Sequence, residues 1–192
     1  MRLDQATAIA ERVKALLAPH CDRIEIAGSI RRRKDDVGDI EIVAIPKPYD
    51  VGLFASGIAP IVNQWPKVRG ELPCKYTQRT LPEGIALDLF FATPTNWGLI
   101  YAIRTGSAEY SHRVLAHGWS VRGFKSVEGV LHNSAGRPVA TPEEEDLFRL
   151  AGVPLVPPEQ RTIESPNKPG ERICEPSAGS KYAPLDGSEA GS

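Results

Sequence analysis

Residues 28–41, GSIRRRKDDVGDIE, constrain the fold of this chain more than any other stretch. They begin with a Gly-Ser pair, continue through a basic cluster and end in two carboxylates, Asp39 and Glu41, that are separated by one isoleucine. Because side chains alternate across a β-strand, acids two residues apart point to the same side. Residues 37–45 are therefore predicted to form a strand with two acids on one face and isoleucines buried against helices on the other.

A third acid, Asp88, interrupts an apolar run, Ile85–Phe91, that is predicted to be another strand. An acid inside an apolar strand costs free energy unless it is paired or holds a metal. In this strand Asp88 shares a face with Ala86 and Phe90. If the three acids converge, they predict a site for divalent metal ions and a polyphosphate.

Such a site favours nucleotidyl transfer, which needs phosphates held in line and their charge neutralised, usually by two Mg²⁺ ions about 3.5–4 Å apart. Carboxylate and phosphate oxygens are the ligands that Mg²⁺ prefers. Asp39 and Glu41 are the candidate ligands of both ions. Asp88 is a candidate ligand and a candidate acceptor for the proton of an attacking hydroxyl. We expect Mn²⁺ to substitute for Mg²⁺.

The Gly28–Ser29 turn is predicted to offer backbone N–H groups to a triphosphate, with Ser29 as the N-cap of a helical turn over 31–34. Arg32 adds positive charge, and Gly38 allows close approach of the backbone. Each signal alone has a simpler interpretation: a plain turn, a solvated strand face or an exposed basic loop. Their order and spacing together favour the enzymatic interpretation.

Composition is that of an ordinary globular protein, with 192 residues, 41% hydrophobic and 24% charged. No apolar run approaches the roughly 20 residues of a membrane span, and the N-terminus lacks a signal-peptide core. Cys21, Cys74 and Cys174 form no zinc spacing with the histidines. We expect a monomer in the cytoplasm, or in the nucleus of a nucleated cell. A net charge of −1 predicts only a modest grip on DNA.

Hydrophobic periodicity predicts an α+β fold, with strands and helices mixed along the chain. A flexible tail is expected over 162–192. Helices are expected over 3–17, 51–65, 96–103 and 109–117, and after an N-cap at Thr141; strands are expected over 23–27, 74–80 and 85–92, with a small sheet within 119–139.

The combined pattern resembles the DNA polymerase β-like nucleotidyltransferase superfamily, and more closely the family X DNA polymerases. The resemblance rests on the Gly-Ser…Gly-Asp-x-Glu signature, the Lys75-Tyr76 hairpin, Arg104-Thr105-Gly106-Ser107 and the closing segments 145–148 and 155–161. It covers about residues 1–161 and implies a nucleotidyltransferase palm over 1–95, a mixed sheet with helices on one face, followed by a small α/β nucleotide-selecting subdomain over 96–161. The layout is similar to the very small viral family X polymerases, so a virus or phage is a candidate source.

The resemblance implies roles for further residues. Asp39, Glu41 and Asp88 would be the metal ligands, and Ser29, Arg32 and Gly38 would contact the β- and γ-phosphates. Thr105, Gly106 and Ser107 would line the sugar and base of the incoming nucleotide, with Tyr110 and Ser111 nearby. Three cations would approach DNA: Lys75, Arg79 and Arg104.

Several residues depart from the family pattern. Glu41 replaces the commoner Asp, Ile103-Arg104 replaces an aromatic pair that helps to exclude ribonucleotides, and Ser111 stands where Asn is common. The chain begins at the palm helix, so we expect no deoxyribose-phosphate lyase activity.

The leading hypothesis for function is a DNA-directed DNA polymerase that uses dNTPs to fill gaps or extend short primers in repair. Two alternatives stay open: template-independent terminal transfer, and a minimal nucleotidyltransferase that adds NMP to RNA, protein or a small molecule. A non-catalytic nucleic-acid binding module ranks below these, because all three acids are present.

Overall fold

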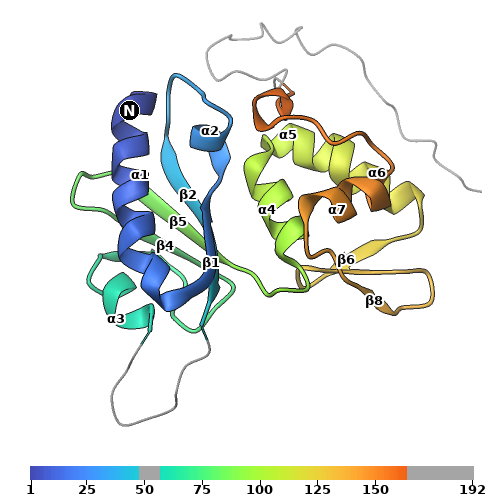
Figure 1. The fold of residues 1–192 in the computed structure, drawn as a ribbon, viewed down its shortest axis with the longest axis horizontal. Helices are drawn as coiled ribbons and strands as arrows, with labels where there is room; N and C mark the ends of the chain where they lie inside the picture. Colours follow the sequence, from blue (N-terminus) through green and yellow to red (C-terminus); the bar gives the residue numbers. More distant parts are fainter. Residues whose placement is uncertain (48–56, 164–192) are drawn as a thin grey trace, which may run out of the picture.

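The computed structural model describes residues 1–47 and 57–163. Its first half is built on a mixed five-stranded sheet of order β1-β2-β5-β4-β3 (Figure 1). The parallel pair is β2 with β5, and the other neighbours are antiparallel. The strands are β1 (Cys21–Ile26), β2 (Asp39–Pro46), β3 (Lys67–Arg69), β4 (Tyr76–Thr80) and β5 (Ala86–Phe91). The α+β prediction is confirmed.

Helix α1 (Leu3–Leu17) covers one face of this sheet, and its predicted bounds are confirmed to the residue. Its apolar stripe packs on the isoleucines of β2 and the leucines of β5, together with the short helix α3 (Ala59–Val62). The 3₁₀ turn at Ala18–His20 follows α1, with Pro19 in its first turn. As the alternation predicted, Ile40 and Ile42 are buried on this face, away from Asp39 and Glu41.

The opposite face of the sheet meets α4 (Trp97–Thr105). Val43 and Phe90 pack there against Trp97 and Tyr101, which lie one turn apart on the helix. This cluster joins the sheet to the second half of the molecule, seen on the right of Figure 1. The three acids belong to this same face, beside the part that α4 covers.

The second half encloses its own core, which includes Leu99, Leu115, Trp119 and Phe148. A continuous helical run forms one side of it, and a helix near the C-terminal end of the described chain forms another. The run comprises α5 (Ala108–Tyr110), a π-helical segment (Ser111–Ala116) and α6 (His117–Val121). It is followed by β6 (Lys125–Val127), β7 (Val130–His132), β8 (Pro138–Val139), α7 (Glu144–Ala151) and a 3₁₀ turn (Pro158–Gln160).

Two helix boundaries differ from prediction near glycines. Helix α2 spans Gly28–Arg31 rather than 31–34, and its N-cap is Ala27, so Ser29 lies inside the helix instead of capping it. The helix predicted to end at Gly118 continues to Val121. Gly118 is kept small by packing: a Cβ there would lie 2.6 Å from the carbonyl oxygen of Ala151.

The start of α7 was also predicted too early. Its N-cap is Glu143, which forms a capping box with Asp146, and not Thr141. Thr141 is instead fully buried and joins the two halves of the chain through backbone hydrogen bonds to Thr95 and Gly98. Of the helix predicted over 51–65, residues 51–56 lie outside the described part. The described remainder contains the short helix α3. The predicted tail lies outside the described part from residue 164 onward.

No helix within the described ranges is long and apolar enough to cross a membrane.

Candidate active site

The register of β2 and β5 brings the three acids together. Glu41 is the direct neighbour of Asp88 across this parallel pair, and Asp39 pairs with Ala86, one step along the same face. All three side chains are half-buried. The alternation expected from the sequence therefore places three carboxylates on adjoining strands.

Burial and mutual repulsion raise the pKa values of two of these acids. Burial, followed by the charge of Asp39, raises the pKa of Glu41 to about 7. Burial likewise raises the pKa of Asp39, and the charge of Asp88 adds to the rise. Arg32 opposes both shifts without cancelling them. The site thus concentrates negative charge that a cation would neutralise.

The donor set suits a hard divalent cation, since it consists of carboxylates from adjacent strands. However, no group of three His, Cys, Asp or Glu side chains among residues 1–47 and 57–163 lies close enough to hold a metal ion as it stands. Asp88 is turned toward β4, where its Oδ1 accepts hydrogen bonds from Tyr76 and Gln78. The acids fit a cation by their chemistry, but their carboxylates would have to move closer together to bind one.

The Gly-Ser turn lies directly against Glu41. Gly28 has a φ of +62°, and a Cβ there would lie 1.9 Å from Oε2 of Glu41. The Oγ of Ser29 and the Nε of Arg32 are buried without a hydrogen-bond partner. Burial also lowers the pKa of Arg32, which Glu41 and Asp39 offset only in part. Unsatisfied buried polar groups are rare, and here they are a cation and a hydroxyl that suit an anionic ligand.

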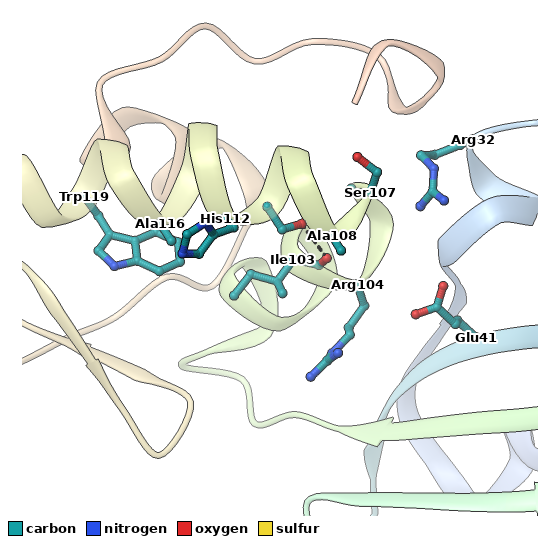
Figure 2. A pocket seen from close by; sticks show the side chains of 11 residues that line it. Arg32, Glu41, Ile103, Arg104, Ser107, Ala108, His112, Ala116 and Trp119 are labelled. Atoms are coloured by element: carbon teal, nitrogen blue, oxygen red, sulfur yellow. Dashed lines mark hydrogen bonds between the residues drawn. The ribbon is translucent and has the colours of Figure 1, made fainter. Parts of the chain in front are cut away.

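A cavity of about 500 Å³ extends from Arg32 and Glu41 to the second half of the molecule (Figure 2). Arg32 and Glu41 line one end, and Ile103, Ala116 and Trp119 line the other. Between them lie small or polar side chains: Gly106, Ser107, Ala108, Ser111 and His112. Figure 2 shows Arg104 reaching in beside Glu41 from α4. The cavity is therefore polar and charged at the sheet and apolar along the helical run.

The predicted nucleotide-binding residues divide into two groups. Gly106, Ser107 and Ser111 line the cavity. Thr105 does not: it is fully buried, with its hydroxyl accepting a hydrogen bond from Arg31 and its carbonyl one from Arg32. Tyr110 packs in the core of the second half. Thr105 and Tyr110 are thus positioned to support the cavity from behind.

Gly38 stands in open space, where a Cβ would meet nothing within 4 Å. The fold itself therefore does not require glycine at this position.

The three predicted DNA-contacting cations also differ. Arg79 is a correction: it is 3% exposed, on the sheet face opposite the acids, and donates to Thr77, Asn63 and Gly70. Lys75 is exposed but paired with Glu128 at 3.0 Å. Arg104 is exposed, and its guanidinium lies 4.0 Å from the centre of the Phe90 ring. Arg79 is two residues from Thr77 in β4, so the two side chains share a face, and both are buried. This alternation is the signal that would have excluded Arg79 as a DNA contact.

Sequence analysis missed two sets of residues. The first is the helical wall of the cavity, Ala108, His112, Ala116 and Trp119, whose spacing by three or four residues marks one helix face. The second is an ionic cluster around Glu144, which pairs with Arg31 and Arg161. Arg31 was left without an assigned role, because nothing local indicates a partner more than a hundred residues away.

A scan against protein-family models found no match for this chain, and no curated protein matches it either.

Proposed function

We propose that this chain is a nucleotidyltransferase that transfers a nucleoside monophosphate from a dNTP to the 3′-hydroxyl of a DNA primer. One observation carries the proposal. A single cavity has Glu41 and Arg32, whose buried Nε lacks a hydrogen-bond partner, at one end and a largely apolar helical wall at the other, and Asp88 lies beside Glu41 on the same face of the sheet. Its volume of about 500 Å³ lies within the range of about 300–1,000 Å³ typical of small-molecule sites.

The proposed orientation of the nucleotide follows from this polarity. The triphosphate lies beside Ser29 and Arg32, where the Ser29 hydroxyl and the Arg32 Nε are buried without a hydrogen-bond partner. The sugar lies at Gly106 and Ser107, and the base against the helical wall at His112. Charged phosphate oxygens gain most from the desolvated guanidinium, whereas the base gains from apolar contact.

In the proposed reaction the primer 3′-oxygen forms a bond to the α-phosphorus while the bond from that phosphorus to the bridging oxygen breaks. Pyrophosphate leaves, and the hydroxyl proton passes to Asp88. Asp39, Glu41 and Asp88 would hold the divalent cations. Two Mg²⁺ ions, when bound, would neutralise charge on the phosphates and lower the pKa of the attacking hydroxyl.

The test offers three DNA substrates: a primed template, a duplex with a one-nucleotide gap, and a single strand. Each is supplied with one dNTP or NTP and Mg²⁺ or Mn²⁺. We expect incorporation directed by the template base, and its loss by about 100-fold or more in Asp39→Asn and Asp88→Asn. Asp36→Asn is the matched control, since Asp36 is an exposed acid that precedes β2 and does not belong to the three acids on the β2–β5 pair. Full activity in Asp39→Asn would reject the proposal.

Template-independent terminal transfer is a second candidate, favoured by the thin DNA grip. Arg79 faces away from the acids, and Lys75 is already paired with Glu128. Untemplated addition to the single strand, at a rate equal to addition on the primed template, would select this candidate over the first.

A further inference from the structure

Asp88 is the acid of the site whose carboxylate is held by other side chains. Nε2 of Gln78 donates to Oδ1 of Asp88 at 2.7 Å, and the Tyr76 hydroxyl donates to the same oxygen at 3.0 Å. Among the described residues, no side chain donates such a hydrogen bond to Asp39 or Glu41. The two donors therefore distinguish Asp88 from its neighbours.

Strand pairing explains why both donors reach one oxygen. Gln78 lies directly opposite Asp88 in the antiparallel β4–β5 pair, and Tyr76 lies opposite Phe90. A tyrosine is long enough to reach the diagonal neighbour on the same face. The two hydrogen bonds thus approach Oδ1 from different sides and fix the rotation of a carboxylate that is otherwise free to turn about its last bond. Oδ2 is left for other ligands.

Tyr76 is itself held by packing. Its ring stacks on Phe90 with centroids 4.9 Å apart, and Arg104 covers the Phe90 ring at 4.0 Å. Burial, and then the hydrogen bond to Asp88, raise the pKa of Tyr76, so the phenol stays a donor at neutral pH. The Tyr76–Phe90–Arg104 stack lines another cavity, of about 250 Å³.

We propose that Gln78 and Tyr76 are positioning residues for Asp88. They hold Oδ1 and so present Oδ2 to the divalent cation and the attacking hydroxyl; this inference rests on the function proposed above. Partners that orient a metal-binding carboxylate typically change cation affinity or activity by about 10- to 100-fold when removed. Because both donors serve one oxygen, either can partly hold the carboxylate alone.

The test uses Gln78→Met and Tyr76→Phe, singly and combined. Each keeps the approximate size of the side chain and removes the donor, and Tyr76→Phe keeps the ring on Phe90. Thr80→Val is the matched control, since Thr80 shares the strand and the face but pairs with Ala86 rather than Asp88. Two quantities are measured on the full chain: Mn²⁺ affinity by electron paramagnetic resonance without nucleotide, and kcat and KM for a dNTP on gapped DNA.

We expect each single variant to lose about 3- to 10-fold in kcat with little change in KM, and the double variant to lose more than the product of the two. Mn²⁺ affinity should fall in the same order, while Thr80→Val matches the wild type. Gln78→His, which restores an N–H donor, should recover part of the loss.

The outcomes separate this inference from the proposed function. Suppose the double variant binds Mn²⁺ more weakly than the wild type, and the wild type incorporates no nucleotide. That result would support positioning and reject the polymerase. Wild-type kcat and Mn²⁺ affinity in the double variant would overturn positioning alone. A wild-type chain that binds no Mn²⁺ would overturn both.

Discussion

Glu41 is the residue in which the demands of folding and of the site conflict most. Its carboxyl is buried beside Asp39, and its pKa of about 7 lies well above the ordinary value. In the metal-free protein, the native state therefore holds a proton that the unfolded chain releases above pH 4.5. The contribution of Glu41 to the free energy of unfolding therefore falls as pH rises from about 4.5 to 7.

This predicts that Glu41→Gln stabilises the metal-free protein at pH 8 but not at pH 4.5. The shift in pKa corresponds to at most about 3 kcal/mol. Urea unfolding in EDTA at the two pH values measures it. Glu11→Gln, at an exposed position on α1, should show no such gain. A Glu41→Gln variant no more stable than wild type at pH 8 would contradict the cause given for the shift.

Gly28 is the second residue at which conformation and site meet. A side chain there suffers from the positive φ and also collides with Glu41. Gly84 has a similar φ of +78° but open space around it. Comparing substitutions at the two glycines therefore separates the cost of backbone strain from the cost of the collision with Glu41.

Gly84→Ala is expected to cost about 1 kcal/mol of stability from its backbone alone, and Gly28→Ala clearly more. Combining Gly28→Ala with Glu41→Ala should recover the excess, because the colliding carboxylate is gone. Chemical denaturation of Gly84→Ala, Gly28→Ala, Glu41→Ala and the double variant measures this. Equal losses of stability in Gly28→Ala and Gly84→Ala would show that the Glu41 side chain moves aside at no cost in free energy.

At the scale of elements, α7 is the helix that holds the two halves in place. Glu144, its first residue, is 8% exposed and receives two hydrogen bonds from Arg31, at 2.8 and 2.7 Å, as well as the Arg161 guanidinium. These cations hold the pKa of Glu144 below its usual value despite its burial. Removing the charge would leave two arginines without their shared partner.

Glu144→Gln is therefore expected to destabilise the protein by about 3 kcal/mol, as for other buried ion pairs that lose one member. Glu145→Gln, one residue along the same helix and exposed, should change stability by less than about 0.5 kcal/mol. Thermal unfolding at pH 7 measures both. Equal melting temperatures for the two variants would mean that the cluster contributes nothing net.

For the whole molecule, two similar contacts join the halves. Arg23 pairs with Glu143 at 2.7 and 2.8 Å and covers Trp97 at 4.3 Å; Arg31 pairs with Glu144 and covers Tyr101 at 3.8 Å. In each, an arginine from the sheet half lies between an aromatic of α4 and a glutamate at the start of α7. These contacts couple the two hydrophobic cores.

We expect one cooperative unfolding transition, with circular dichroism and tryptophan fluorescence giving the same midpoint. Trp65 reports on the first half, Trp119 on the second, and Trp97 on the cluster that joins them. The double variant Arg23→Ala and Arg31→Ala should separate the two midpoints. Two transitions in the wild-type protein would show that the halves fold independently.

Local chemistry let the sequence determine the elements of the site. Period-two alternation predicted that Asp39 and Glu41 share one face of their strand, and the apolar run 85–91 predicted a second strand that carries Asp88. The apolar stripe over residues 3–17 defined α1. These patterns need only a few neighbouring residues, so they can be read without knowing the rest of the fold. The α+β class follows from the same patterns.

Only the tertiary structure decided what surrounds the acids. Strand register gave Asp88 the donors Gln78 and Tyr76, and packing turned Arg79 into the core and Arg31 toward Glu144. The helical run brought His112 and Trp119 to a cavity whose other wall is the sheet. Register and packing join residues far apart in the chain, and no local period encodes which distant side chain will fill a given space.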